Sequence, residues 1–312
     1  MNVLITGGLG FVGRHLTRVL LKQGHEVTVT GTRRTVDAPN SPGFRYIPTD
    51  TTRRGYWQQF AAKADVCVNL AGRNIFRRWG ASYKQQLYDS RILTTRNLVA
   101  AISEASPAIL ISTSAVGYYG DRGDEILEET AAPGTDFLAD LSKDWEAEAL
   151  AAERLGARVA VSRFGIVLGT GGGALSKMLP AFKLFLGGPI GDGRHWIPWI
   201  HVRDVVAAIV FLIENRECRG VYNFSAPEPA RYNDFSTALG KALGRPSVVR
   251  TPAFAIRLIM GRELGDVLLG SQRAVPHRLL EAGYQFQYTN IDSAMIDLTR
   301  PTPGKTGSAQ DG

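Results

Sequence analysis

The chain contains little cysteine and no long hydrophobic run. Only Cys67 and Cys218 are cysteines among its 312 residues, which excludes a disulfide framework and fits a reducing cytoplasm. Its longest uncharged apolar run, residues 205–213, is far shorter than the roughly 20 residues that a membrane-spanning helix needs. The N-terminus lacks a basic segment followed by an apolar one, so we expect no secretory signal. We therefore expect a cytoplasmic protein with no membrane among its partners.

Two further classes of function lack their usual signals. No spacing of cysteine and histidine typical of a metal site occurs, and we expect no metal. The formal net charge is +7, but the arginines are scattered in pairs such as Arg53-Arg54 and Arg77-Arg78 and form no compact basic segment. We therefore expect no nucleic acid among the partners.

Glycine, by contrast, is abundant and clustered, and one cluster directly follows the apolar run Val3-Leu4-Ile5. A buried strand that ends in closely spaced glycines and then begins a helix binds phosphates, because the backbone can approach them and the helix start supplies free N–H groups. Apolar residues recur at helical spacing after the cluster, at Val12, Leu16, Val19 and Leu20. We therefore predict a dinucleotide-binding βαβ unit. Its cofactor contacts would come from Gly7, Gly10, Phe11, Val12 and Gly13.

Strand-like and helical segments alternate through the first half of the chain. Apolar runs typical of strands lie at residues 27–30, 44–48, 66–70, 109–111 and 159–161. Helical patterns lie at 83–105 and 137–155, and Asp50 is predicted to cap a short helix near residues 57–60. Strands that alternate with helices at this spacing imply parallel pairing and right-handed crossovers. The predicted fold class is α/β, a Rossmann-type doubly wound parallel sheet.

The composition changes after residue 165, where glycine-rich stretches alternate with short apolar segments. We predict a Rossmann domain at 1–165 and a smaller C-terminal substrate-side region at 166–298. Because helical spacing resumes at 202–215, residues 202–225 are expected to return to the Rossmann domain. The remaining residues, 299–312, lack a core-forming pattern and are predicted to be a disordered tail.

Several motifs resemble those of extended short-chain dehydrogenases/reductases, the nucleotide-sugar epimerase group. These motifs are the glycine loop, Asn69-Leu70-Ala71-Gly72, and residues 163–169 and 199–205. More narrowly, Ser90-Arg91, Trp145-Glu146 and residues 117–121 and 186–191 resemble an atypical branch usually labelled "epimerase family protein". Residues 270–276 resemble the uncharacterised C-terminal domain of that branch. The resemblance covers about residues 1–298 and implies an NADP(H)-binding protein that acts on a small molecule.

The loop after the second strand indicates which nucleotide is bound. An NAD site usually places a carboxylate about 20 residues beyond the glycines, but this chain has Thr32-Arg33-Arg34 there and no acid before Asp37. A guanidinium at that place would pair with the 2′-phosphate of NADP(H), although a solvated arginine pair is the alternative. We predict NADP(H) and leave open which of Arg33 and Arg34 makes the contact.

The resemblance implies further cofactor contacts. Leu70, Ala71 and Gly72 would line the cofactor, and Asp50 resembles an acid that touches adenine, although a helix cap needs no such role. Arg91 and Ser112 would also contact the cofactor, and Val167 would lie near the nicotinamide.

The catalytic dyad of this superfamily is missing. The resemblance implies a proton-transferring tyrosine followed four residues later by a lysine, but Ala139 stands four residues before Lys143. Three possibilities remain open. Tyr118 or Tyr119 acts as the acid with help from Lys143 and with Ser112 or Ser114 polarising the substrate, or the substrate or water supplies the proton. In the third, the protein binds NADP(H) without turnover.

The predicted function is therefore an NADP(H)-dependent oxidoreductase or epimerase-like enzyme acting on an unidentified small molecule. The alternative is a non-catalytic NADP(H)-binding sensor or interaction protein. Because extended relatives often pair through their two long helices, the resemblance also implies a possible homodimer.

Overall fold

A parallel sheet of seven strands forms the centre of the protein. The computed structural model describes residues 1–37, 39–102 and 108–300. The strand order is β11-β7-β5-β4-β1-β2-β3, and every neighbouring pair is parallel. Their bounds are β1 (Asn2–Thr6), β2 (Glu26–Gly31), β3 (Phe44–Pro48), β4 (Val66–Asn69), β5 (Ile109–Ala115), β7 (Arg158–Phe164) and β11 (Gly220–Phe224). The predicted doubly wound Rossmann-type fold is confirmed.

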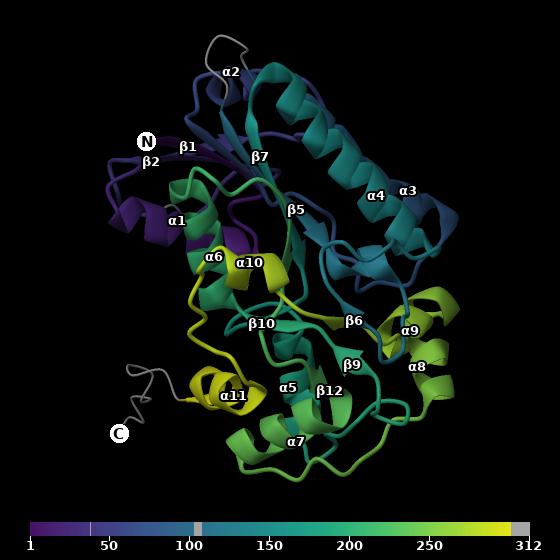
Figure 1. Cartoon of the computed structure of the whole chain (residues 1–312). Helices are drawn as coiled ribbons and strands as arrows, with labels where there is room; N and C mark the ends of the chain where they lie inside the picture. Colours follow the sequence, from purple (N-terminus) through teal and green to yellow (C-terminus); the bar gives the residue numbers. More distant parts are fainter. Residues whose placement is uncertain (38, 103–107, 301–312) are drawn as a thin grey trace, which may run out of the picture.

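Helices cover both faces of this sheet (Figure 1). On one face α1 (Phe11–Lys22) packs beside α6 (Val202–Glu214), and on the other α3 (Ala81–Val99) packs beside α4 (Phe137–Leu150). The four-residue helix α2 (Gln58–Ala61) lies on the same face as α3. Strands buried on both faces read as nearly continuous apolar runs, which is why β1 and β4 are uninterrupted in the sequence.

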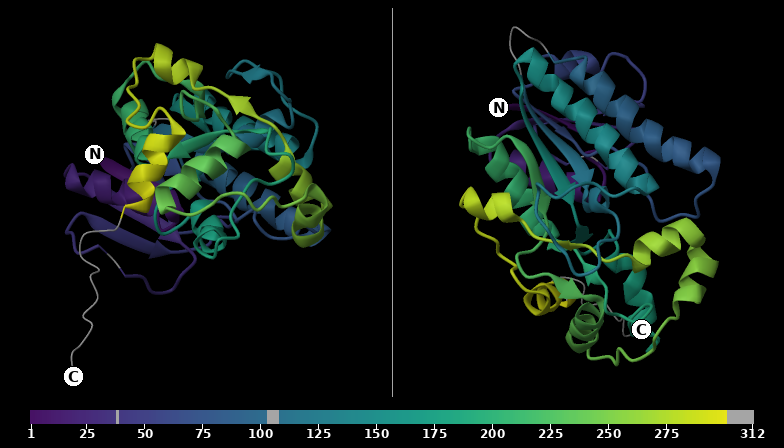
Figure 2. Two further views of the ribbon diagram at one scale, coloured as in Figure 1. Left: turned by 90° about the horizontal axis from the view of Figure 1, so that it is seen from below. Right: turned by 45° about the vertical axis from the view of Figure 1, so that its right-hand side comes forward.

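The chain after β7 crosses between the sheet and a smaller lower region (Figures 1 and 2). Two short ladders lie in this region: β8 (Ile166–Leu168) with β10 (Trp199–His201), and β9 (Trp196–Ile197) with β12 (Ala230–Arg231). A third ladder, β6 (Ile126–Leu127) with β13 (Arg273–Ala274), joins the loop after β5 to the C-terminal part of the chain. The helices of this region are α5 (Leu175–Lys183), α7 (Tyr232–Leu243), α8 (Ala253–Met260), α9 (Arg262–Leu269) and α11 (Ile291–Thr299), whereas α10 (His277–Glu281) packs against β11 of the sheet. This region has its own apolar core, with Trp199, Phe235 and Met295 buried together.

Several local expectations were wrong. Asp50 does not cap α2, because its carboxylate accepts bonds from the backbone and hydroxyl of Thr52 in a tight turn, and α2 begins only at Gln58 with no side-chain cap. The helix expected at 83–105 ends at Val99, and residues 103–107 lie outside the described residues. Thr299, expected in the tail, is the last residue of α11, whereas residues 301–312 lie outside the described part.

The structure also shows the environment of the cysteines and the character of the helices. Both cysteines, Cys67 and Cys218, are free and buried. Burial raises the pKa of the Cys67 thiol to about 12. Among the described residues no helix has both the length and the apolar character needed to cross a membrane.

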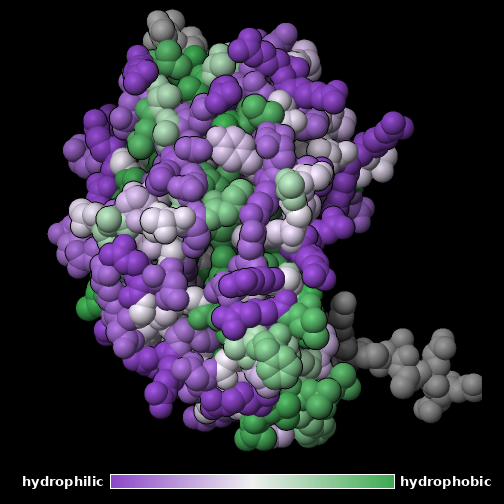
Figure 3. Space-filling model, turned by 90° about the vertical axis from the view of Figure 1, so that its right-hand side faces the viewer, coloured by the Kyte–Doolittle hydropathy of each residue, from purple (hydrophilic) through white to green (hydrophobic). Residues whose placement is uncertain are grey.

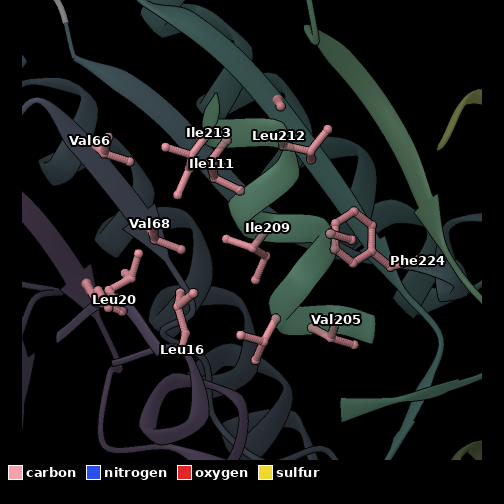
Figure 4. Close-up of a cluster of buried hydrophobic side chains, with 14 of the residues drawn as sticks. Leu16, Leu20, Val66, Val68, Ile111, Val205, Ile209, Leu212, Ile213 and Phe224 are labelled. Carbon is pink, nitrogen blue, oxygen red and sulfur yellow. The ribbon is translucent and has the colours of Figure 1, made fainter. Parts of the chain in front are cut away.

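Helix α6 packs an apolar side against the sheet. Val205, Ile209 and Ile213 point from α6 toward strand residues such as Val68 and Ile111 (Figure 4). His201 caps the N-terminus of this helix, because its ring nitrogen accepts a hydrogen bond from the backbone N–H of Arg203.

Truncation of this contact tests how much it stabilises the fold. Ile209 is fully buried, so Ile209→Ala should lower the free energy of unfolding by about 2–5 kcal/mol through lost burial and a residual cavity. Val19 lies on α1 and is 36% exposed, so Val19→Ala is the matched control and should cost well below 1 kcal/mol, within the roughly ±0.5 kcal/mol usual for surface changes. Urea unfolding followed by tryptophan fluorescence measures both, and equal losses would contradict the packing described.

Candidate functional site

A cavity of about 620 Å³ opens at the carboxyl edge of β1, β2 and β4. In doubly wound sheets ligands bind at this edge, where the strand order reverses on either side of the first strand. Eight of the residues expected to hold a cofactor line it: Gly7, Gly10, Thr32, Arg33, Asp50, Leu70, Ala71 and Gly72. The structure therefore brings together residues from four separate stretches of the sequence.

The glycine loop is shaped by close backbone contacts. Gly7 has φ +69°, and a Cβ there would lie 2.9 Å from the Cα of Ala71. A Cβ on Gly13 would lie 2.5 Å from the Cα of Gly8, so only glycine lets α1 start against the end of β1. The first turn of α1 has neither a capping side chain nor an acidic residue. Its N–H groups are therefore available to an anion.

Phe11 and Val12 serve packing rather than the cavity wall. Neither lines the cavity, and Val12 packs against the apolar core beneath α1. The ring of Phe11 lies against the glycine-rich loop after β8, where a Cβ on Gly172 would meet it at 2.5 Å. Phe11 thus connects the glycine loop to the loop that follows β8. Val167, which was expected near the nicotinamide, is half-buried on β8 and does not line the cavity.

The two arginines after β2 differ in their position relative to the cavity. Arg33 lines the cavity and Arg34 does not. The Tyr46 hydroxyl donates a 2.7 Å bond to the backbone carbonyl of Arg33, which holds this turn against β3. Tyr46 also lines the cavity, and sequence reasoning missed it.

Arg91 supports the cavity from behind. A Cβ on Gly72 would lie 3.2 Å from its guanidinium carbon, and Arg91 donates bonds to the backbone carbonyls of Leu87 and Arg73 at 3.1 and 3.0 Å. Burial lowers its pKa to about 10. These bonds fix the loop after β4, and Arg91 does not line the cavity itself.

Further cavity residues escaped sequence reasoning. Arg73 follows Gly72 directly and adds a second exposed guanidinium, and Asp89 and Ser90 line the wall formed by α3. The position of Arg73 immediately after the Leu70-Ala71-Gly72 motif was a usable signal. Asp89 and Ser90 on α3 had no such signal in the sequence, because which side of α3 faces the cavity depends on how that helix packs on the sheet.

A buried polar network begins where β5 ends. The hydroxyl of Ser114 donates a 2.6 Å bond to Glu146 on α4, and Glu146 pairs with Arg163 on β7 through two 2.8 Å bonds. Burial by itself would lower the pKa of Arg163, but Glu146 raises it above the ordinary value. Ser112 is also buried, and its hydroxyl accepts a 3.4 Å bond from Asn69.

The two candidate tyrosines have different environments. Tyr119 is fully buried, and its hydroxyl donates to Asn223 at 2.7 Å and accepts from Arg163 at 2.9 Å. Burial raises its pKa to about 12. Tyr118 is half-buried, and the guanidinium of Arg163 lies 3.4 Å from its ring centroid. Of the two, only Tyr118 retains an accessible side chain.

Lys143 stands on the exposed face of α4. Its ammonium donates a 2.8 Å bond to Asp140, which raises its pKa, and Tyr118 adds a smaller contribution in the same direction. Ala139, at the place of the missing tyrosine, is fully buried beneath the turn that carries Tyr118. The turn after β5 therefore occupies the space above the missing position.

A second cavity of about 360 Å³ lies beside this turn. Gly117 and Gly120, which flank the two tyrosines, line it together with Trp79, Phe137 and Val267. Its walls come from the Rossmann half and from α9. No group of three or more His, Cys, Asp or Glu side chains placed to hold a metal ion occurs in residues 1–37, 39–102 and 108–300.

Comparison with known proteins matches this architecture. Residues 3–224 match the model of the NAD dependent epimerase/dehydratase family. The chain belongs to this family. Residues 251–298 match a second model, a domain of unknown function designated DUF1731.

Relatives of this epimerase family chain align along almost its whole length. It is 39% identical over 303 residues to "Epimerase family protein MT2273" of Mycobacterium tuberculosis, covering 96% of this chain and 98% of the relative. It is 36% identical over 299 residues to the chloroplastic "Epimerase family protein SDR39U1 homolog" of Arabidopsis thaliana, covering 95% and 86%. The crystal structure of human epimerase family protein SDR39U1 (isoform 2) with NADPH superposes with a TM-score of 0.84 at 34% identity, covering 96% and 99%.

The buried ion pair of this epimerase family member can be tested by removing one charge. Glu146→Gln leaves the Arg163 guanidinium uncompensated, so the free energy of unfolding should fall by roughly 3–5 kcal/mol. Glu148→Gln on the same helix removes the half-buried partner of the exposed Arg96 and should cost less than about 1 kcal/mol. Chemical denaturation compares the two variants. Similar losses would show that the pair at Arg163 is not the stabilising element.

Proposed function

We propose that the protein is an NADP(H)-dependent oxidoreductase or epimerase-like enzyme that acts on a small molecule. The observation that carries this proposal is the 620 Å³ cavity, in which the glycine loop, the uncapped start of α1 and Arg33 converge. The NADPH in the human relative supports the same nucleotide for this chain.

The residues present fit a dinucleotide phosphate. The backbone of Gly7 and Gly10 and the first turn of α1 would hold the pyrophosphate, because no side chain at these glycines stands in the way. Arg33 would bind the 2′-phosphate through charge-assisted bonds, with Arg73 as a second cation of the cavity. Leu70 and Ala71 would contact the adenosine side.

When bound, NADPH supplies a hydride, and the chain must position the acceptor and provide or accept a proton. Tyr118 is the residue we assign to proton transfer, because its side chain is partly accessible and Lys143 lies near enough for its charge to interact with the phenol. The Ser114 hydroxyl donates its hydrogen bond to Glu146, so we assign Ser114 to positioning the turn that carries Tyr118. The 360 Å³ cavity beside Gly117 would hold the substrate.

A second candidate function is a protein that binds NADP(H) without turnover. It is favoured by Ala139 at the place of the usual tyrosine and by the bond of Lys143 to Asp140, which turns the ammonium away from a cofactor-holding role. The two functions share the nucleotide site and differ in whether Tyr118 moves a proton.

The nucleotide assignment is tested with single arginine variants. A charge-assisted bond is worth roughly 1.5–3 kcal/mol, so Arg33→Ala should weaken NADPH binding by about ten- to hundredfold while changing NADH binding far less. Arg34→Ala is the matched control and should change neither, since Arg34 lies outside the cavity. Calorimetry measures the affinities. Equal weakening of both nucleotides by Arg33→Ala would refute the 2′-phosphate contact.

The catalytic assignment is tested by comparing the two neighbouring tyrosines. Tyr118→Phe should lose about 10²–10⁴-fold in turnover with NADPH affinity retained, because general acid help is lost. Tyr119→Phe should instead lower the free energy of unfolding by about 1–3 kcal/mol, because buried partners lose their bond. The readout is NADPH oxidation across carbonyl compounds and nucleotide sugars. Wild-type binding without hydride transfer across that panel would favour the second candidate function.

A further inference from the structure

Helix α8 presents an apolar surface to solvent. None of its eight residues is buried, and Phe254, Leu258 and Ile259 are 71%, 75% and 68% exposed. Its contact within the chain is with α9, where Arg257 crosses close to Gly265. An apolar helix normally buries one face, so this one lacks the covering that its sequence predicts.

A second apolar segment lies beside it. Leu184, Phe185 and Leu186 are 55–68% exposed at the end of α5. Residues 187–191 that follow form backbone bonds with residues 249–251, directly before α8. We call residues 184–186, Val248, Phe254, Leu258 and Ile259 the apolar face. Figure 3 shows hydrophobic residues gathered on the lower part of the surface that carries α8 and α9.

The backbone at Phe185 lies in the left-handed region, within this exposed segment. Phe185 has φ +63°, and it is the one non-glycine residue with positive φ in the described part of the chain. This left-handed position at a helix end usually carries glycine, because a side chain there is sterically costly. The chain instead places a large aromatic residue there, 55% exposed, between two exposed leucines.

The charges around the apolar face are mainly positive, and the two exposed acids on α9, Glu263 and Asp266, are each paired with a cation, Lys84 and Arg257. Residues 235–262 contain no Asp or Glu, and neither do residues 154–191. The exposed cations of these two segments next to the face are Lys183, Arg245, Arg250, Arg257 and Arg262. In the described part of the chain only Arg257 among these five has a carboxylate partner, Asp266 at 2.7 Å. The apolar face is therefore rimmed by cations with little compensation.

We propose that this face docks on an anionic lipid bilayer, with the side chains of α8 and residues 184–186 entering the interface and the rim cations binding the headgroups. Exposed Phe, Leu and Ile combined with Arg and Lys are the composition of helices that lie in a membrane surface. The expectation of no membrane partner followed from the lack of a spanning run, and a peripheral surface needs no such run. The docking is independent of NADP(H) binding and of the proposed catalysis.

A second copy of the chain fits this face less well. A two-fold contact would place the same rim cations of both copies against each other, and like charges at an interface oppose association. An anionic bilayer instead complements the four rim cations that have no carboxylate partner in the described part of the chain, Lys183, Arg245, Arg250 and Arg262.

Sedimentation of the full-length protein with vesicles tests the docking. It should bind vesicles of mixed phosphatidylcholine and phosphatidylglycerol, should not bind phosphatidylcholine alone, and should be released as salt is raised. Each cation near an anionic surface contributes about fivefold in partition, so Arg250→Gln/Arg262→Gln should weaken binding by about thirtyfold. Phe254→Ser/Leu258→Ser should weaken it by at least about tenfold.

The matched control is Arg53→Gln/Arg54→Gln, which removes two exposed arginines from the Rossmann half and should leave vesicle binding unchanged. Circular dichroism and NADPH affinity report whether each variant is folded. Failure of the wild-type protein to bind the mixed vesicles at low salt would overturn the proposal, as would an equal loss in the control. A dimer in sedimentation velocity that Phe254→Ser/Leu258→Ser dissociates would overturn it in favour of self-association.

Discussion

The paired charges of Arg163 and Glu146 connect most of the elements around the candidate active site. Arg163 on β7 binds Glu146 on α4 and Tyr119 in the turn after β5, while Glu146 accepts the bond from Ser114. Asn223 on β11 continues the network and donates to the backbone of Val275 before α10. Buried charges are tolerated only when their partners are complete. The pair therefore fixes the sheet, the turn and the C-terminal segment in one arrangement.

This network explains how the site differs from a site built on a Tyr-xxx-Lys dyad. Ala139, at the place where the resemblance implies a tyrosine, is fully buried on α4, and α4 packs against the turn that carries Tyr118. The guanidinium of Arg163 over the Tyr118 ring holds that side chain beside α4. The 620 Å³ cavity lies at the carboxyl edge of β1, β2 and β4, and the turn that carries Tyr118 follows the carboxyl end of the neighbouring β5. The proposed function therefore assigns nucleotide binding and proton transfer to different residues at the same edge of the sheet.

The apolar face that includes α8 lies away from the 620 Å³ cavity. It lies on the smaller lower region, whereas the nucleotide cavity lies at the edge of the sheet (Figures 1 and 2). Lys84 on α3 pairs with Glu263 on α9 and so ties the α8–α9 pair to the Rossmann half. A protein held at a bilayer through α8 would keep α9, and the 360 Å³ cavity that Val267 lines, close to the lipid surface.

The sequence by itself determined the parallel sheet, the glycine loop and the family, because strand periodicity, glycine spacing and motif order are local properties of the chain. It also predicted a nucleotide contact from Arg33 or Arg34, and only the fold distinguishes the two, because Arg33 lines the cavity and Arg34 does not. Likewise Tyr118 and Tyr119 are neighbours in sequence, and burial alone distinguishes them. The Arg163–Glu146 pair and the exposure of α8 were decided by tertiary packing, because each depends on how separate elements dock on one another.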